Sequence, residues 1–172
     1  MRSSRAVFVL LCGVCLALLS ETSLAQQSPD LLAKENLGGI KIGLSEKQLL
    51  SVLGKATVKK SAQTTLEEAT GDYVQTWACA DLGLTLRMSS GAKKTGAKSV
   101  ASLTAVAPCK LRTARDIGIG SSREDVVKAY GAVEDKEASK QETFVAGSVY
   151  GGIIFSFKNG KVSQIFLGAA AE

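Results

Sequence analysis

Alternation of apolar and polar residues predicts the strands of this chain. The clearest case is 82–88, where four apolar residues alternate with Gly83, Thr85 and Arg87. The apolar side is expected to face the core, so Arg87 is expected to point outward. Similar patterns predict further strands at 57–60, 73–79, 100–107, 144–150, 152–158 and 161–167, with Asn159-Gly160 as a hairpin turn.

Helical periodicity follows two serines, Ser45 and Ser122. A serine hydroxyl accepts a hydrogen bond from the first turn of a helix, and Gln48 and Asp125 complete a capping-box spacing three residues later. The apolar face of each helix is expected to consist of three residues: Leu49, Leu50 and Leu53 in the first helix, and Val126, Val127 and Tyr130 in the second.

Each helical pattern ends at a glycine, Gly54 or Gly131, where a left-handed residue is expected. With about nine residues each, the helices are too short to be stable alone and must pack on the strands that follow. A polar lead-in precedes them, with one turn of helix near residues 30–35.

The helix-containing stretch occurs twice, at 40–54 and 117–131. The two copies share five identical positions without a gap: Ile40/Ile117, Ile42/Ile119, Gly43/Gly120, Ser45/Ser122 and Gly54/Gly131. We therefore predict a tandem duplication, with repeat 1 at 26–111 and repeat 2 at 112–172 in one globular domain. Side by side, the repeats predict an α+β fold in which one antiparallel sheet of six to eight strands carries both helices on one face.

The duplicated motif, Ile-x-Ile-Gly-Leu-Ser-x-x-x-Leu-Leu-x-x-Leu-Gly at 40–54, resembles that of the β-lactamase inhibitory protein family. It also resembles the related small lipoprotein of the outer-membrane β-barrel assembly machinery. The resemblance implies a two-repeat sheet whose open face binds a target protein. The inhibitors carry one disulfide in each repeat and many more tyrosine and tryptophan residues than this chain.

The first 25 residues are typical of a cleavable secretory signal. Arg2 and Arg5 precede an apolar stretch at 6–19, and Ser23-Leu24-Ala25 offers a cleavage site. Cleavage after Ala25 removes two arginines and one glutamate, which leaves 19 basic and 15 acidic residues and a net charge of +4. We therefore expect an exported protein, periplasmic or secreted, that does not span the membrane.

Two cysteines remain after the signal, Cys79 and Cys109. In an exported protein such a pair is typical of a disulfide. The bond would close a loop of about 30 residues and stabilise the folded protein by roughly 3.5 kcal/mol. The alternative is two free thiols.

Catalytic chemistry has little support in the sequence. The chain contains no histidine, which removes the usual general base and the commonest metal ligand. Adjacent carboxylates such as Glu67-Glu68 and Glu124-Asp125 are typical of solvated surface. We expect no enzyme activity, no cofactor and no metal site, and export disfavours nucleic acid as a partner.

Binding chemistry is better represented. Seven basic residues and no acid lie between positions 82 and 115, which indicates either a solubilising surface or a basic rim for an acidic partner. Aromatic pairs share strand faces at 73–79 and 144–150, either as binding anchors or as core. The candidate partner-binding residues are Tyr73, Trp77, Arg87, Lys93, Lys94, Phe144 and Tyr150.

These observations predict an exported, non-catalytic protein-binding module that inhibits, or confers immunity against, an enzyme of its compartment. The alternative is an envelope scaffold that binds membrane-protein subunits or anionic lipid.

Overall fold

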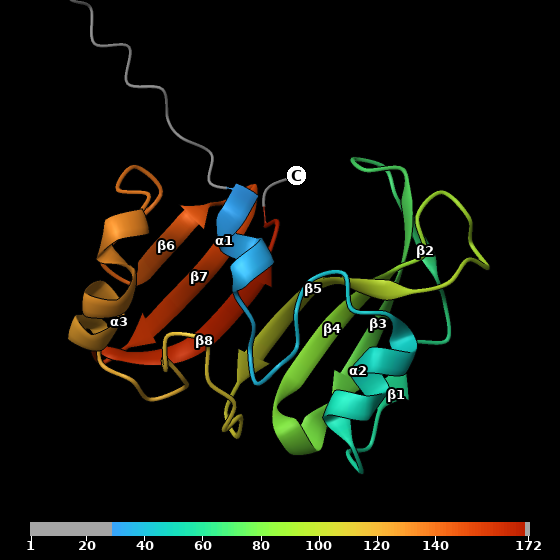
Figure 1. The fold of residues 1–172 in the computed structure, drawn as a ribbon, viewed down its shortest axis with the longest axis horizontal. Coiled ribbons are helices and arrows are strands. Elements are labelled where there is room, and N and C mark those ends of the chain that lie inside the picture. Colours follow the sequence, from blue (N-terminus) through green and yellow to red (C-terminus); the bar gives the residue numbers. More distant parts are fainter. Residues whose placement is uncertain (1–28, 171–172) are drawn as a thin grey trace, which may run out of the picture.

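The computed structural model describes residues 29–170, which build one eight-stranded antiparallel sheet with short helices (Figure 1). This confirms the α+β class. The predicted signal peptide lies outside the described residues. The elements in chain order are α1 (Pro29–Lys34), α2 (Glu46–Leu53), β1 (Lys59–Lys60), β2 (Thr65–Glu67), β3 (Asp72–Cys79), the 3-10 helix η1 (Ala80–Leu82), β4 (Leu84–Ser89), β5 (Ser99–Val106), α3 (Arg123–Tyr130), the 3-10 helix η2 (Gly131–Val133), β6 (Thr143–Ser148), β7 (Gly151–Lys158) and β8 (Lys161–Gly168).

The strand order is β1-β3-β4-β5-β8-β7-β6, and β2 pairs separately with β3. The sheet therefore divides at the β5–β8 pair into a first half (residues 36–111) and a second half (residues 112–170). The two halves join in antiparallel register from Leu103 opposite Leu167 to Val106 opposite Gln164. The alternation of apolar and polar residues predicts the ends of the six longer strands, β3 to β8, to within three residues. It does so because one face of each of these strands lies in the core.

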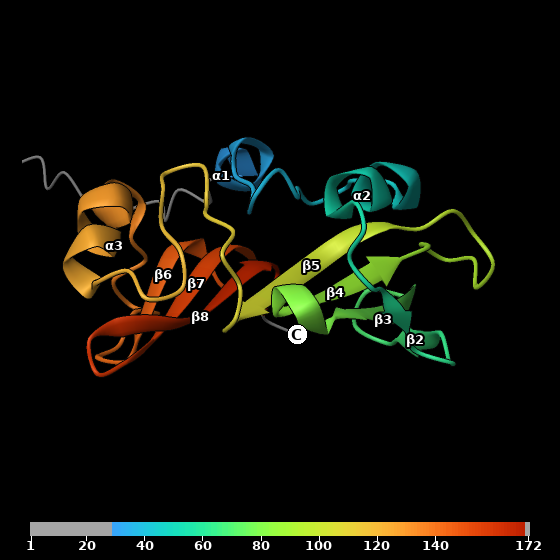
Figure 2. The same ribbon diagram turned by 90° about the horizontal axis from the view of Figure 1, so that it is seen from below.

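Figure 2 shows α1, α2 and α3 on the same side of the strands. Between helices and sheet lies one continuous cluster of buried side chains that includes Trp77, Leu86, Phe144 and Phe155. The apolar faces of the helices are narrower than predicted, since Leu50 is 39% and Val127 46% exposed. In each helix the first and last of the three predicted core positions are buried, and the middle one lies at the helix flank.

The loop before each helix is anchored to the start of a central strand. In the first half the amide of Gly43 donates to the carbonyl of Val100 at 2.8 Å, and in the second half the amide of Gly120 donates to the carbonyl of Val162 at 2.8 Å. The two glycines have φ of +84° and +89°, a left-handed conformation that costs glycine nothing. The same backbone device thus positions both helices.

Both predicted capping boxes are formed. The hydroxyls of Ser45 and Ser122 accept hydrogen bonds from the amides of Gln48 and Asp125, whose side chains in turn accept from the serine amides. The hydrogen bonds from Ser122 hold the pKa of Asp125 below its ordinary value, because they favour the charged carboxylate.

The two helices end differently. Gly54 has φ +60° and terminates α2, as predicted. Gly131 has φ −56°, so the prediction of a left-handed residue there is wrong, and the chain continues from α3 into η2.

The segment α1 belongs to the first repeat in sequence but packs on the second half of the sheet (Figure 1). Leu31 is buried against Gly147 on β6. Just after α1, the buried carboxylate of Glu35 accepts a hydrogen bond from Arg115 at 3.1 Å, and the Arg115 guanidinium lies 4.7 Å from the centre of the Tyr130 ring. This cluster joins the lead-in segment to α3, and burial raises the pKa of Tyr130 far above its ordinary value.

Candidate binding surface on the open sheet face

The sheet face turned away from the helices carries a mixture of small, β-branched, polar and aromatic side chains. Because Leu84, Leu86 and Leu103 belong to the core cluster, their neighbours in sequence point to the opposite face. One row of cross-strand partners on that face spans six strands: Ala78, Thr85, Thr104, Phe166, Ile154 and Val145. None of the helices α1 to α3 lies on this side (Figure 2). We call it the open face.

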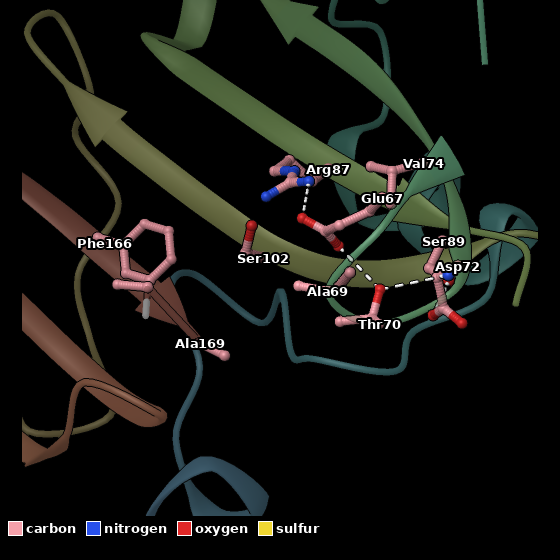
Figure 3. A pocket seen from close by; sticks show the side chains of 12 residues that line it. Glu67, Ala69, Thr70, Asp72, Val74, Arg87, Ser89, Ser102, Phe166 and Ala169 are labelled. Atoms are coloured by element: carbon pink, nitrogen blue, oxygen red, sulfur yellow. Dashed lines mark hydrogen bonds and ion pairs between the residues drawn. The ribbon is translucent and has the colours of Figure 1, made fainter. Parts of the chain in front are cut away.

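A cavity of about 270 Å³ opens on this face, where the two halves meet (Figure 3). It is bounded by β2 and the turn that follows, by the strands β3, β4, β5 and β8, and by the residues after β8. The lining residues are Glu67, Ala69, Thr70, Asp72, Val74, Arg87, Ser89, Ala101, Ser102, Phe166, Ala169 and Ala170.

Arg87 is the sequence-predicted site residue that the structure places in this cavity. It points outward from β4, as predicted, and its cross-strand neighbours are Thr76 and Ser102. Its Nη2 donates to Oε1 of Glu67 at 2.5 Å. The arginine side chain is 41% exposed and the glutamate 20% exposed, so the pair remains accessible to solvent on its cavity side.

A polar network holds the turn after β2 against the sheet. Thr70 donates to Oε2 of Glu67 at 3.1 Å and accepts from the amide of Asp72 at 3.3 Å. The carboxylate of Asp72 accepts from the hydroxyl of Ser89 at 2.7 Å. The wall of the cavity is therefore built from charged and hydroxyl groups that already hold one another in place.

The predicted aromatic anchors do not gather on the open face. Trp77 and Phe144 are fully buried among the helices and strands, so their assignment as partner-binding residues is wrong. The Trp77 indole donates to Gln75 at 3.0 Å, which satisfies its one polar group within the protein. Tyr73 is half-buried on the same side of β3 as Trp77, and Tyr150 is 70% exposed in the turn between β6 and β7.

The predicted basic run does not form one surface. Lys93 and Lys94 are exposed on the loop between β4 and β5, outside the cavity lining. Three of the seven basic residues bind acids at separate places: Arg87 with Glu67, Arg112 with Asp116, and Arg115 with Glu35. Two of these acids, Glu67 and Glu35, come from distant segments, and the third, Asp116, directly follows the run.

Of three further cavity residues, Glu67 is interpreted from the sequence as solvated surface charge, and Ser102 and Phe166 are not identified as site candidates. β2 has three residues, too few to show an alternation, so Glu67 fell within a stretch expected to be an irregular polar connection. Phe166 stands between Ile165 and Leu167, and the apolar run conceals that it faces the other side. The alternation of Phe166 with the core residues Ile165 and Leu167 is the one sequence signal for its orientation.

The predicted disulfide between Cys79 and Cys109 is not formed, and both cysteines are free and buried. Cys79 lies at the end of β3, whereas Cys109 follows β5 and lies beside Gly83. β4 lies between β3 and β5 in the sheet and Cys109 lies in the turn beyond β5, so the two cysteines do not stand on neighbouring strands. Burial raises the pKa of both thiols, which keeps them protonated and unreactive.

Within residues 29–170, no group of three or more His, Cys, Asp or Glu side chains is placed to hold a metal ion. In that same part of the chain, every helix is too short or too polar to cross a membrane. No protein-family model matches the chain, and no curated protein and no solved structure matches it. The functional inference therefore depends on the geometry of the open face.

Proposed function

We propose that this chain is an exported, non-catalytic protein-binding module that acts as an inhibitor or immunity protein on an enzyme of the periplasm or the extracellular space. The observation that carries the proposal is the open face: a broad sheet surface that none of the helices α1 to α3 covers, with an accessible arginine and a cavity near its centre.

We further propose that the two halves are copies of one helix-plus-strands unit joined edge to edge, with the helices on one face. The mirrored strand order supports this proposal, since β3-β4-β5 and β6-β7-β8 meet at their last strands. The matching hydrogen bonds of Gly43 and Gly120 to β5 and β8 support it as well. This is the architecture that the resemblance to β-lactamase inhibitory proteins implies.

Both edges of the sheet are occupied, which favours binding through the face. At one edge β1 and β2 cover opposite ends of β3, and Ser61 donates between them to the carbonyl of Thr76 at 2.8 Å. At the other edge, Asp135 donates to the carbonyl of Val145 at 2.9 Å, and the amide of Val145 donates to the hydroxyl of Ser139. Covered edges block addition of a partner strand.

The test is capture of a partner from periplasmic extract and culture fluid by wild type and two arginine variants. Thr104→Arg places a charge in the central row of the open face, and Val127→Arg places the same charge on the exposed flank of α3. We expect Thr104→Arg to lose the partner and Val127→Arg to retain it, and the purified partner enzyme to lose activity when wild type is added. Equal capture by both variants would contradict the open face as the binding surface.

The alternative function, an envelope scaffold, has one supporting observation: Lys93 and Lys94 are exposed on a loop beside the sheet, where they can approach acidic proteins or anionic lipid. Capture of membrane-complex subunits without loss of any enzyme activity would favour it. Lys93→Glu with Lys94→Glu would then reduce capture.

A further inference from the structure

We propose that the cavity on the open face is a carboxylate-binding site, in which Arg87 and Ser102 donate to an acidic group of the partner and Phe166 contacts an adjoining apolar group. This inference rests on the proposed function and deepens it, because it names the chemistry that the open face recognises.

Arg87 has unused donors. A guanidinium carries five N–H groups in a planar fork that matches a carboxylate with two parallel hydrogen bonds. Within residues 29–170, Arg87 uses only Nη2, toward Glu67, while Nε and Nη1 donate to no protein acceptor. Figure 3 shows Arg87 next to the Glu67 carboxylate, with Ser102 nearby. The arginine therefore presents donors to an incoming anion.

Ser102 supplies a second donor at the same place. It is 5% exposed and lines the cavity, and its hydroxyl forms no hydrogen bond with another described residue. The hydroxyl oxygen itself is reached by solvent from the cavity, so it is free to donate to a ligand there. Ser102 is the direct cross-strand partner of Arg87, so both side chains project from the same face of the sheet.

Gly168 keeps the space beside Ser102 open. A Cβ at Gly168 would lie 2.6 Å from the Cβ of Ser102, and the residue has φ +143°. Both the close approach and the backbone conformation require glycine at this position. The end of β8 thus leaves the Ser102 hydroxyl unobstructed.

The cavity is asymmetric, which orients the ligand. Phe166 lies at one end and Asp72 at the other, with Arg87 and Ser102 between them (Figure 3). Glu67 and Asp72 are both negatively charged, so the ligand's carboxylate is expected on the side of the Arg87 guanidinium away from Glu67, beside Ser102, with its apolar neighbour against the Phe166 ring. A partner segment with an acidic residue next to an apolar one fits this arrangement.

Glu67 is an internal competitor for the same guanidinium. It comes from the turn segment that Thr70 holds against the sheet, and its Oε1 occupies one side of the Arg87 fork. Removing its charge frees that side of the fork and reduces repulsion of an anion. Glu67→Gln is therefore expected to tighten carboxylate binding, and Glu68→Gln, on an exposed neighbour outside the lining, is the matched control.

The test uses the signal-cleaved chain (residues 26–172) and three short peptides: acetyl-Asp-Phe-amide, its neutral counterpart acetyl-Asn-Phe-amide, and acetyl-Ala-Phe with a free C-terminus. Each is titrated to about 20 mM, above the millimolar range expected of a small ligand, while the Nε–H resonance of Arg87 is followed by NMR. We expect saturable shifts with the aspartyl peptide and none with the asparaginyl peptide. A comparable response to the free C-terminus would assign the site to chain ends as well as side chains, and both results support a carboxylate site.

The variants decide whether the named residues form the site. Arg87→Lys, which keeps the charge and loses the fork, and Ser102→Ala are each expected to weaken binding at least about threefold, and Glu67→Gln to strengthen it about threefold relative to Glu68→Gln. Absence of saturable shifts in wild type and in Glu67→Gln, or binding indifferent to Arg87→Lys and Ser102→Ala, would overturn the proposal. The peptide test needs no protein partner, so its failure is distinguishable from a failure to capture one.

Discussion

The two halves of the sheet share a frame and differ in what is attached to it. In both halves, a left-handed glycine ties the capping loop to a central strand, and a capping box starts a helix of eight residues. The first half adds β1 and β2 along β3, and the turn after β2 walls the cavity on the open face. The second half instead covers β6 with the irregular segment 134–140, and it receives α1 on its helix side.

The difference is that strands common to both halves form the floor of the cavity, whereas segments without a counterpart in the other half form its wall. Glu67, Thr70 and Ala169 line the cavity and lie outside the repeated motif. Loops are freer to vary than the strands they connect, because few core contacts depend on them. Residues at corresponding positions of the two halves, such as Gly54 and Gly131, differ in their backbone conformation. The following predictions test such differences.

The largest expected effect is in the shared core. Trp77 and Phe144 occupy the same side of the sheet in the two halves, and both are fully buried. Truncation of either to alanine is expected to cost about 3–5 kcal/mol of unfolding free energy. Because the core cluster is continuous, denaturant unfolding should remain a single transition in both variants. Two separate transitions would show that the halves are independent units.

The second prediction concerns the ion pair between Glu35 and Arg115, which joins the lead-in segment to the rest of the protein. Arg115→Met leaves the Glu35 carboxylate buried without its cation, and the expected cost is about 2–3 kcal/mol. This is less than for a fully buried pair, because Arg115 is 37% exposed. The double variant Arg115→Met with Glu35→Gln should recover part of the loss in denaturant unfolding. No recovery would mean that packing of Arg115 on Tyr130, rather than its charge, holds the segment.

The two helix-ending glycines give opposite predictions. Gly54→Ala forces a Cβ into positive φ and should destabilise the protein by about 1 kcal/mol. Gly131→Ala introduces a Cβ at φ −56°, with its nearest contact an ordinary 3.7 Å from Val127, and should stabilise by about 0.5 kcal/mol. Thermal unfolding of the two variants measures the difference directly. Equal losses would contradict the distinct helix ends.

The smallest expected effect is a loss of helix stability at low pH, which should occur at the capping box of α3 but not at that of α2. The folded-state pKa of Asp125 lies below its ordinary value of 3.8, chiefly because the Ser122 hydroxyl donates to it. Its contribution to stability is therefore present above that ordinary value and is lost as pH falls through the lower folded pKa. The first turn of α3 should lose hydrogen-exchange protection on acidification more than that of α2, where Gln48 does not titrate. Asp125→Gln should remove this difference.

Local signals in the sequence determined the elements and their order. The alternation at 82–88 located β4 and the outward direction of Arg87, and the serine caps located the starts of α2 and α3. These features depend on neighbours within a few residues, where side-chain periodicity and capping chemistry act. The α+β class follows from the same signals.

Tertiary structure alone decided which side chains meet. The sequence left the side of Trp77 and Phe144 open, and packing placed both in the core. The sequence predicts a disulfide between Cys79 and Cys109, but in the folded chain both are free and buried. Glu67 reaches Arg87 across 20 residues of chain because β2 turns back over the sheet. Contacts of this kind are set by strand order and loop path, which no local pattern encodes, and the cavity consists of such contacts.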